Sequence, residues 1–173
     1  MTKRTVYARY ADKAALFKAS VQRAIERLIV PHATLQALET ADLEATLAAV
    51  ARLRVAQVMT PAGLKLQRII NTESYRFPEI FTMAYEQSTR PVIEFLAGLL
   101  RREIATGALA VADPERAAVV FMSMVVSGPV RIIVSGNRLT RREIEDRLQF
   151  AIGLFLNGVR VRDERHRNKD TRQ

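Results

Sequence analysis

Residues 2–17 read TKRTVYARYADKAALF and combine four basic side chains, two tyrosines and two threonines in a short stretch with helical spacing. Asp12 is placed to cap a second, amphipathic helix from about residue 13 to residue 30, where Pro31 ends it. Basic and hydroxyl groups at helical spacing suit contacts with phosphates and base edges in a DNA groove. The stretch therefore predicts two consecutive helices, of which the first has the composition of a DNA-contacting element.

The composition predicts an all-α globular protein. Of 173 residues, 49% are hydrophobic, and glycine and proline number only 7 and 6. There is no cysteine, which excludes disulfides and thiolate metal sites and favours a reducing cytoplasm. The first residues are charged and polar and do not resemble a secretory signal.

The formal net charge of +9 is concentrated near the two ends of the sequence. Residues 1–30 carry seven basic and two acidic side chains, and residues 160–173 carry six basic and three acidic ones. This distribution could attract a polyanion such as DNA. For the segment 160–173 alone, a purely solubilising role is the favoured interpretation.

Capping residues and prolines divide the middle of the chain into helices. Helix starts are expected at Asp42, Thr60-Pro61, Pro78, Asp113-Pro114 and Thr140, the last with Glu143 at capping-box spacing. Pro91 should kink the helix expected over 78–106, or divide it with Ser88 or Thr89 as a new cap. The most apolar helix should loosen at residues 127–129. No strand pattern and no internal repeat is visible.

Two separated segments resemble one protein family. Residues 2–17 resemble the recognition helix and following turn of TetR-family transcriptional regulators. Residues 64–92 resemble the C-terminal ligand-binding and dimerisation domain of that family, through the run Arg68-Ile69-Ile70, then Glu73, then Arg76-Phe77-Pro78-Glu79. The resemblance implies a TetR-like helical bundle with a partial helix-turn-helix at 1–30, a ligand-binding and dimerisation domain at 31–161, and a charged tail at 162–173.

The resemblance also implies which residues contact DNA. In the family, the recognition helix is capped, faces the groove with basic side chains, and offers hydroxyls to the phosphate backbone. The matching residues here are Thr2 as the cap, Lys3, Arg4 and Arg9 toward the groove, Thr5 and Tyr7 toward phosphates, and Lys13 as a phosphate contact at the next helix.

The family's effector pocket lies among the central helices, which correspond to about residues 43–106. Candidate lining residues are apolar, aromatic or able to hydrogen-bond to a ligand, with methionine suited to varied apolar ligands. They are Met59, Leu66, Arg68, Ile70, Asn71, Tyr75, Met83, Tyr85 and Phe95, of which Arg68 or Asn71 would be the polar contact.

The last two helices of each subunit form a four-helix bundle with their twins in this family. The sequence offers one apolar face on each: Phe121, Met124, Val125 and Gly128 on the first, and Ile144, Leu148, Ile152 and Phe155 on the second. These stripes predict a homodimer interface, because two such apolar helices exceed what a small bundle buries alone. The alternative is that they form ordinary intramolecular core.

Other functional classes find little support in the sequence. Residues 117–130 are uncharged, but fourteen residues fall short of the roughly 20 that cross a bilayer, so a buried helix is expected. His32 and His166 form no spaced metal pair, and there is no glycine-rich phosphate loop. We therefore expect neither an enzyme nor a metal or other cofactor.

The expected function is DNA-binding transcriptional regulation, by repression, under control of a small-molecule effector. In the family two helices precede the recognition helix, whereas here Met1 alone precedes residue 2. One hypothesis is that the natural protein begins upstream. A second is a dimeric ligand-binding protein without DNA-binding activity, and a third is a helical scaffold that binds acidic partners through its basic ends.

Overall fold

The computed structural model describes residues 12–137 and 139–161. This part of the chain is helical, with a single isolated bridge between Leu109 and Arg160 and no strand, so the predicted all-α fold class is confirmed. The elements are α2 (Lys13–Glu26), α3 (His32–Ala37), α4 (Leu43–Val58), α5 (Pro61–Glu73), α6 (Pro78–Ala84), the π-helical turn η1 (Tyr85–Thr89), α7 (Arg90–Ala105), α8 (Pro114–Met122), the π-helical turn η2 (Ser123–Ser127), α9 (Gly128–Val134) and α10 (Arg141–Val159).

Side-chain caps begin most of the long helices where the sequence predicts them. Each capping oxygen accepts a hydrogen bond from a first-turn amide that would otherwise lack a partner. The caps are Asp12, Asp42, Thr60 and Asp113, and Thr140 with Glu143 forms the complete capping box. One expectation differs: α2 ends at Glu26, and the short helix α3 occupies the segment expected to be a linker, with Leu35 buried.

Two prolines explain the two π-helical turns. Pro91 and Pro129 each lie two residues after such a turn, and each lacks the amide that an α-helix donates to the carbonyl four residues earlier. One extra residue in the preceding turn lets the chain continue as a helix; the Arg90 amide donates to the Tyr85 carbonyl, five residues back. Thus Pro91 does not divide the helix with Ser88 or Thr89 as a cap, since neither makes a side-chain cap bond there.

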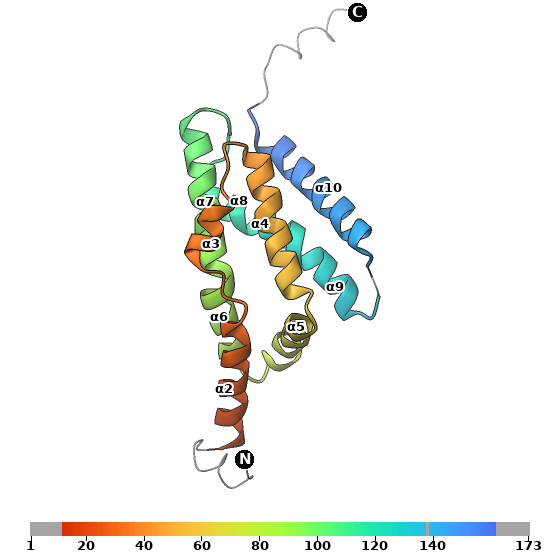
Figure 1. Cartoon of the computed structure of the whole chain (residues 1–173). Coiled ribbons are helices and arrows are strands. Elements are labelled where there is room, and N and C mark those ends of the chain that lie inside the picture. Colours follow the sequence, from red (N-terminus) through yellow and green to blue (C-terminus); the bar gives the residue numbers. More distant parts are fainter. Residues whose placement is uncertain (1–11, 138, 162–173) are drawn as a thin grey trace, which may run out of the picture.

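The helices drawn in Figure 1 contribute to two clusters of buried side chains. The larger joins α4, α7, α8, η2 and α10 and includes Leu96, Phe121 and Ile152. The smaller joins α2 to α5 and α6, through Ile25 against Ile80 and their neighbours. Helix α2 extends from the end of the bundle opposite the α7–α8 connection, and this second cluster attaches it to the body.

Polar and aromatic contacts reinforce the α2 attachment. Lys18 pairs with Glu79 of α6 at 2.5 Å, and the rings of Phe17 and Phe77 have centroids 5.6 Å apart. Gln22 donates to Gln87 of η1 at 2.8 Å. These contacts join α2 to both α6 and η1.

Helices α8 and α9 with the intervening η2 form one 20-residue apolar run, residues 114–133, with a mean hydropathy of 1.5 in its most apolar window. Length and composition alone would allow this run to cross a membrane. However, core residues of soluble proteins pass the same test, and Phe121 and Val125 belong to the large core cluster. We therefore interpret this run as a helix of the protein core that is buried on part of its surface.

Candidate functional site

A partly open cavity of about 290 Å³ lies among the central helices, and exposed residues such as Phe81 form part of its wall. Residues of α4, α5, α6, η1, α7, α8 and η2 line it, so that both π-helical turns contribute to its wall. Such turns often occur at functional sites. The wall is mainly apolar and aromatic, with a few polar groups, as in small-molecule sites. Its members include Val58, Phe81, Tyr85, Ile93, Met122 and Val126, with Arg54, Gln67 and Thr89 as polar groups.

Arg54 is the one cation in this wall, and only 4% of the residue is exposed. Its Nη1 donates to the Gln57 side chain at 3.0 Å and to the Leu28 carbonyl at 3.2 Å, and its Nη2 donates to the Ser88 hydroxyl at 3.3 Å. All three acceptors are neutral, and Nε is buried without a hydrogen-bond partner. Burial lowers the pKa of Arg54 because it disfavours the charged form.

The cavity is connected to α2 through the Leu28 carbonyl. Leu28 follows the end of α2, and its oxygen accepts bonds from both Arg54 and the Ser88 hydroxyl, each at 3.2 Å. Ser88 belongs to η1 and is itself 6% exposed. One buried hydrogen-bond network therefore joins the cavity wall, η1 and the end of α2.

The structure brings only part of the predicted pocket together. Ile70 and Tyr85 line the cavity. The other seven predicted residues lie elsewhere. Three line separate hollows: Met59 between α4 and α10, and Asn71 and Phe95 at two further ones. Leu66 and Met83 lie in or against the smaller core, whereas Arg68 is exposed and Tyr75 is 96% exposed. The predicted residues therefore surround several hollows and the smaller core, and only two of them share this cavity.

Sequence reasoning missed Arg54, although a signal was present. Helix α4 buries Val50, Ala51, Val55 and Val58 on one face, and Arg54 falls within that spacing. A charged residue on an apolar helical face is rarely buried without a charged or polar partner. The interruption of the stripe could therefore have marked a polar site inside the bundle.

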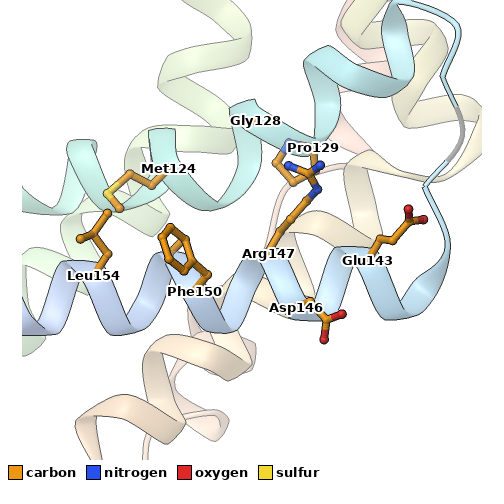
Figure 2. A pocket seen from close by; sticks show the side chains of 9 residues that line it. Met124, Gly128, Pro129, Glu143, Asp146, Arg147, Phe150 and Leu154 are labelled. Atoms are coloured by element: carbon orange, nitrogen blue, oxygen red, sulfur yellow. The ribbon is translucent and has the colours of Figure 1, made fainter.

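A second candidate surface is an apolar groove of about 510 Å³ between α10 and the α8–α9 helix. Figure 2 shows Met124, Phe150 and Leu154 gathered at one end, and Arg147 directed toward Gly128 and Pro129. Phe150 is 74% and Leu154 56% exposed. Exposed apolar side chains that gather in this way often mark an interaction surface.

The structure divides the residues predicted for the dimer interface between the core of the protomer and this groove. Five of the predicted side chains, Phe121, Val125, Leu148, Ile152 and Phe155, lie in the protomer's own core. Met124 and Gly128 line the groove, and Ile144 packs partly against the core. The most regular apolar stripe of each helix fills the protomer, as in the alternative stated above, and the neighbouring face remains exposed.

Of the predicted DNA contacts, only Lys13 lies in the described part of the chain. It is exposed at the first position of α2, beside the Asp12 cap. Thr2, Lys3, Arg4, Thr5, Tyr7 and Arg9 lie outside the described residues. Among the described residues, no group of three or more histidine, aspartate or glutamate side chains could hold a metal ion.

Comparison with known proteins identifies the family. The family model of the AefR-like transcriptional repressor C-terminal domain matches residues 45–158. No curated protein matches the chain. The chain therefore belongs to the TetR family of ligand-responsive transcriptional regulators. The matched residues contain the cavity and the groove described above.

Solved structures agree with this assignment. The chain is similar to a TetR-family regulator of Mesorhizobium loti, with 25% identity, a TM-score of 0.69, and coverage of 92% of this chain and 81% of that one. It is also similar to the flavonoid-responsive regulator FrrA, with 29% identity, a TM-score of 0.67, and coverage of 94% and 83%. A TetR-family regulator of Pseudomonas syringae shares the fold at 20% identity, with a TM-score of 0.67 and coverage of 94% and 81%.

Members of this family share several general properties. TetR-family regulators bind DNA, form dimers and respond to small-molecule effectors. They are generally not enzymes, and they are soluble cytoplasmic proteins.

Proposed function

We propose that this chain is a homodimeric, cytoplasmic repressor without enzymatic activity, which leaves its operator when an effector fills the cavity. The main support is the hydrogen-bond network through Leu28. It joins the cavity wall at Arg54 to the end of α2, the helix that directly follows the residues resembling a recognition helix. An effector that changes this network alters the position of α2, and a change in the spacing of two recognition helices weakens binding to successive major grooves.

The proposed DNA contacts are Thr2, Lys3, Arg4, Thr5, Tyr7, Arg9 and Lys13. They rest on the resemblance of residues 2–17 to the family's recognition helix. The exposed position of Lys13 at the start of α2 supports its role, because the amino end of a helix favours an anionic phosphate. Lysine and arginine in the preceding turn would add groove and backbone contacts.

The proposed dimer interface is the groove between α10 and the α8–α9 helix. Its centre is Phe150, Leu154 and Met124, and its rim carries Glu143 and Arg147. An apolar centre within a charged rim is the usual anatomy of a protein interface. In a two-fold dimer the same surface is used by both copies, so the four helices form a bundle.

The proposed effector is an aromatic small molecule. Phe81 and Tyr85, both in the cavity wall, stack at an interplanar angle of 11° with centroids 6.4 Å apart. Such rings offer flat apolar faces to an aromatic ligand. FrrA, which is similar in fold and 29% identical, is a flavonoid-responsive regulator, and flavonoids are therefore the first compounds to test.

Fluorescence anisotropy of the purified chain on DNA flanking its gene tests the proposal. We expect specific binding that the double variant Lys3→Ala, Arg4→Ala weakens at least tenfold, because lost phosphate and groove contacts are costly. The matched control is Arg101→Ala, Arg116→Ala, which removes the same charge from exposed positions on α7 and α8 and should bind as the parent does.

The same titration separates the proposal from its alternative. Addition of a flavonoid panel should release the DNA. A folded dimer that binds a flavonoid but no flanking DNA would contradict the proposal and support a dimeric ligand-binding protein without DNA-binding activity.

A further inference from the structure

We infer that the effector of the cavity is an aromatic carboxylic acid and that Arg54 binds its carboxylate. This inference rests on the proposed effector role of the cavity and specifies the chemistry of the ligand. It is drawn from the hydrogen bonds of one buried guanidinium and from a matched arginine on the same helix.

Arg54 lacks the counter-charge that a buried cation needs. In the described part of the chain no carboxylate lies within 4.0 Å of its guanidinium, although eight other ion pairs are formed there. Removing a cation from water is costly unless an anion or a full set of hydrogen bonds replaces the hydration. A bound carboxylate would supply the missing charge.

The least satisfied donors of Arg54, Nε and Nη2, lie on the edge of the guanidinium that a carboxylate prefers. Nη1 uses both protons, toward Leu28 and Gln57, whereas Nε has no acceptor and Nη2 makes one long bond of 3.3 Å to Ser88. The Nε and Nη2 protons point along one edge and can bind the two oxygens of a carboxylate in parallel.

Arg52, two residues earlier in α4, shows this geometry in the same protein. Its Nε donates to the Glu145 carboxylate at 3.0 and 3.1 Å, and its Nη2 donates to the same group at 2.5 Å. Arg52 thus has the partner that Arg54 lacks. The difference is location, since Arg52 is exposed and meets α10, whereas Arg54 meets the cavity.

Binding of a carboxylate must rearrange the Leu28 network. Nε is covered in this structure, so the guanidinium has to turn toward the cavity before both oxygens can reach it. That turn strains or breaks the bonds to Leu28 and Ser88. An acid would therefore do more than fill the cavity, because it would release the end of α2 from η1.

The apolar remainder of the cavity selects the body of the ligand. Phe81, Tyr85, Ile93 and Met122 form walls that favour an aromatic or otherwise apolar skeleton. A small hydrophilic anion such as phosphate would leave these walls unfilled. An acid with one or two fused aromatic rings matches both the cation and the walls.

Isothermal titration calorimetry with 2-naphthoate and its neutral analogue 2-naphthamide tests the inference at neutral pH. We expect the acid to bind at least tenfold more tightly than the amide, since a charge-assisted bidentate pair replaces a neutral contact. In Arg54→Met this preference should disappear while the amide still binds. Arg54→Lys keeps the positive charge but lacks the two parallel donors of a guanidinium, and it should show an intermediate preference for the acid.

The matched control is Arg52→Met, which removes the same group from the same helix outside the cavity and should leave the preference unchanged. Three outcomes would overturn the inference: equal affinities of acid and amide for the parent chain, a preference that persists in Arg54→Met, or no binding of the acid at millimolar concentration. If Arg54→Met does not fold, an Arg54→Lys variant that prefers the acid over the amide as strongly as the parent would equally overturn the inference.

The outcome is independent of the DNA experiment. A chain released from DNA by neutral flavonoids, with no preference for naphthoate, would retain the proposed function and lose the inference. A chain that binds naphthoate through Arg54 but does not bind flanking DNA would retain the inference and lose the repressor role.

Discussion

Phe150→Asp should convert the protein from a dimer to a monomer. Phe150 belongs to α10 and lines the groove beside Leu154 and Met124 (Figure 2), and it is 74% exposed in the protomer. If the groove is the dimer interface, this ring is covered by the partner. The substitution removes the ring and places a charge in the apolar centre, while the protomer's own core is untouched.

The size of the effect follows from the exposed area. A phenylalanine presents roughly 200 Å², so a ring that is 74% exposed offers about 150 Å². If about 100 Å² of this is buried by the partner, at roughly 25 cal/mol per Å² the loss is about 2.5 kcal/mol per protomer. Because a two-fold dimer contains two copies of this contact, the total loss of association free energy is about 5 kcal/mol. The dissociation constant of the dimer should therefore rise by a factor on the order of 10³ to 10⁴.

Sedimentation equilibrium over a range of concentrations measures the dissociation constant directly. We expect the parent chain to be dimeric at low micromolar concentration and Phe150→Asp to be monomeric there, with an unchanged circular dichroism spectrum. Tyr75→Asp is the control, because Tyr75 is 96% exposed after the end of α5 and outside the groove. A Phe150→Asp dimer as tight as the parent would refute the assignment of the groove.

Three stability predictions rest on contacts within the protomer. A Cβ at Gly63 would lie 2.6 Å from two carbonyl oxygens at the end of α4, so Gly63→Ala should cost about 1–3 kcal/mol in urea unfolding. Gly98→Ala is the control, because the atom nearest to the added Cβ would be 3.9 Å away and alanine within a helix should stabilise the protein by about 0.5–1 kcal/mol. Equal stabilities of the two variants would contradict the close contact at Gly63. The Arg52 guanidinium lowers the pKa of Glu145 to about 2, so the stability from this pair is complete above the ordinary glutamate pKa and is lost as pH falls toward 2. Glu145→Gln should remove that pH dependence. The stability lost with the pair is at most about 1 kcal/mol, because the pair is exposed. Identical acid unfolding of the parent and the variant would contradict this prediction. Thr140→Ala should lower the unfolding free energy by about 1 kcal/mol through loss of the capping box, and an unchanged thermal midpoint would show that the cap contributes nothing.

Helix starts could be predicted from the sequence because capping is local chemistry. An aspartate or threonine oxygen that bonds an amide two or three residues later needs no other part of the chain, and Asp42, Thr60 and Thr140 all act in this way. The end of α2 was predicted less well. Its last residues depend on the turn into α3, where the buried Leu35 contributes to the large core.

Which face of a helix points inward could not be predicted, because it depends on distant partners. Helix α10 places Ile152 and Phe155 in the large core, and Phe150 and Leu154 in the exposed groove beside Met124. Both sets are apolar, and spacing alone does not tell core from interface. Tyr75 shows the same limit, since its ring could have packed into the bundle but lies almost fully exposed.

The two π-helical turns both contribute to the cavity wall, and each also contacts another part of the protein that the proposed function involves. In η2, Ser123, Val126 and Ser127 line the cavity, while Met124 lines the groove proposed as the dimer interface. In η1, Tyr85 lines the cavity while Gln87 and Ser88 bond to α2 and to the carbonyl that follows it. A turn that already departs from α-helical bonding needs little rearrangement to shift register. Under the proposed function, a ligand in this cavity would act on the proposed interface through η2 and on α2 through η1. The two prolines that follow these turns would then be part of the proposed switch rather than defects in two long helices.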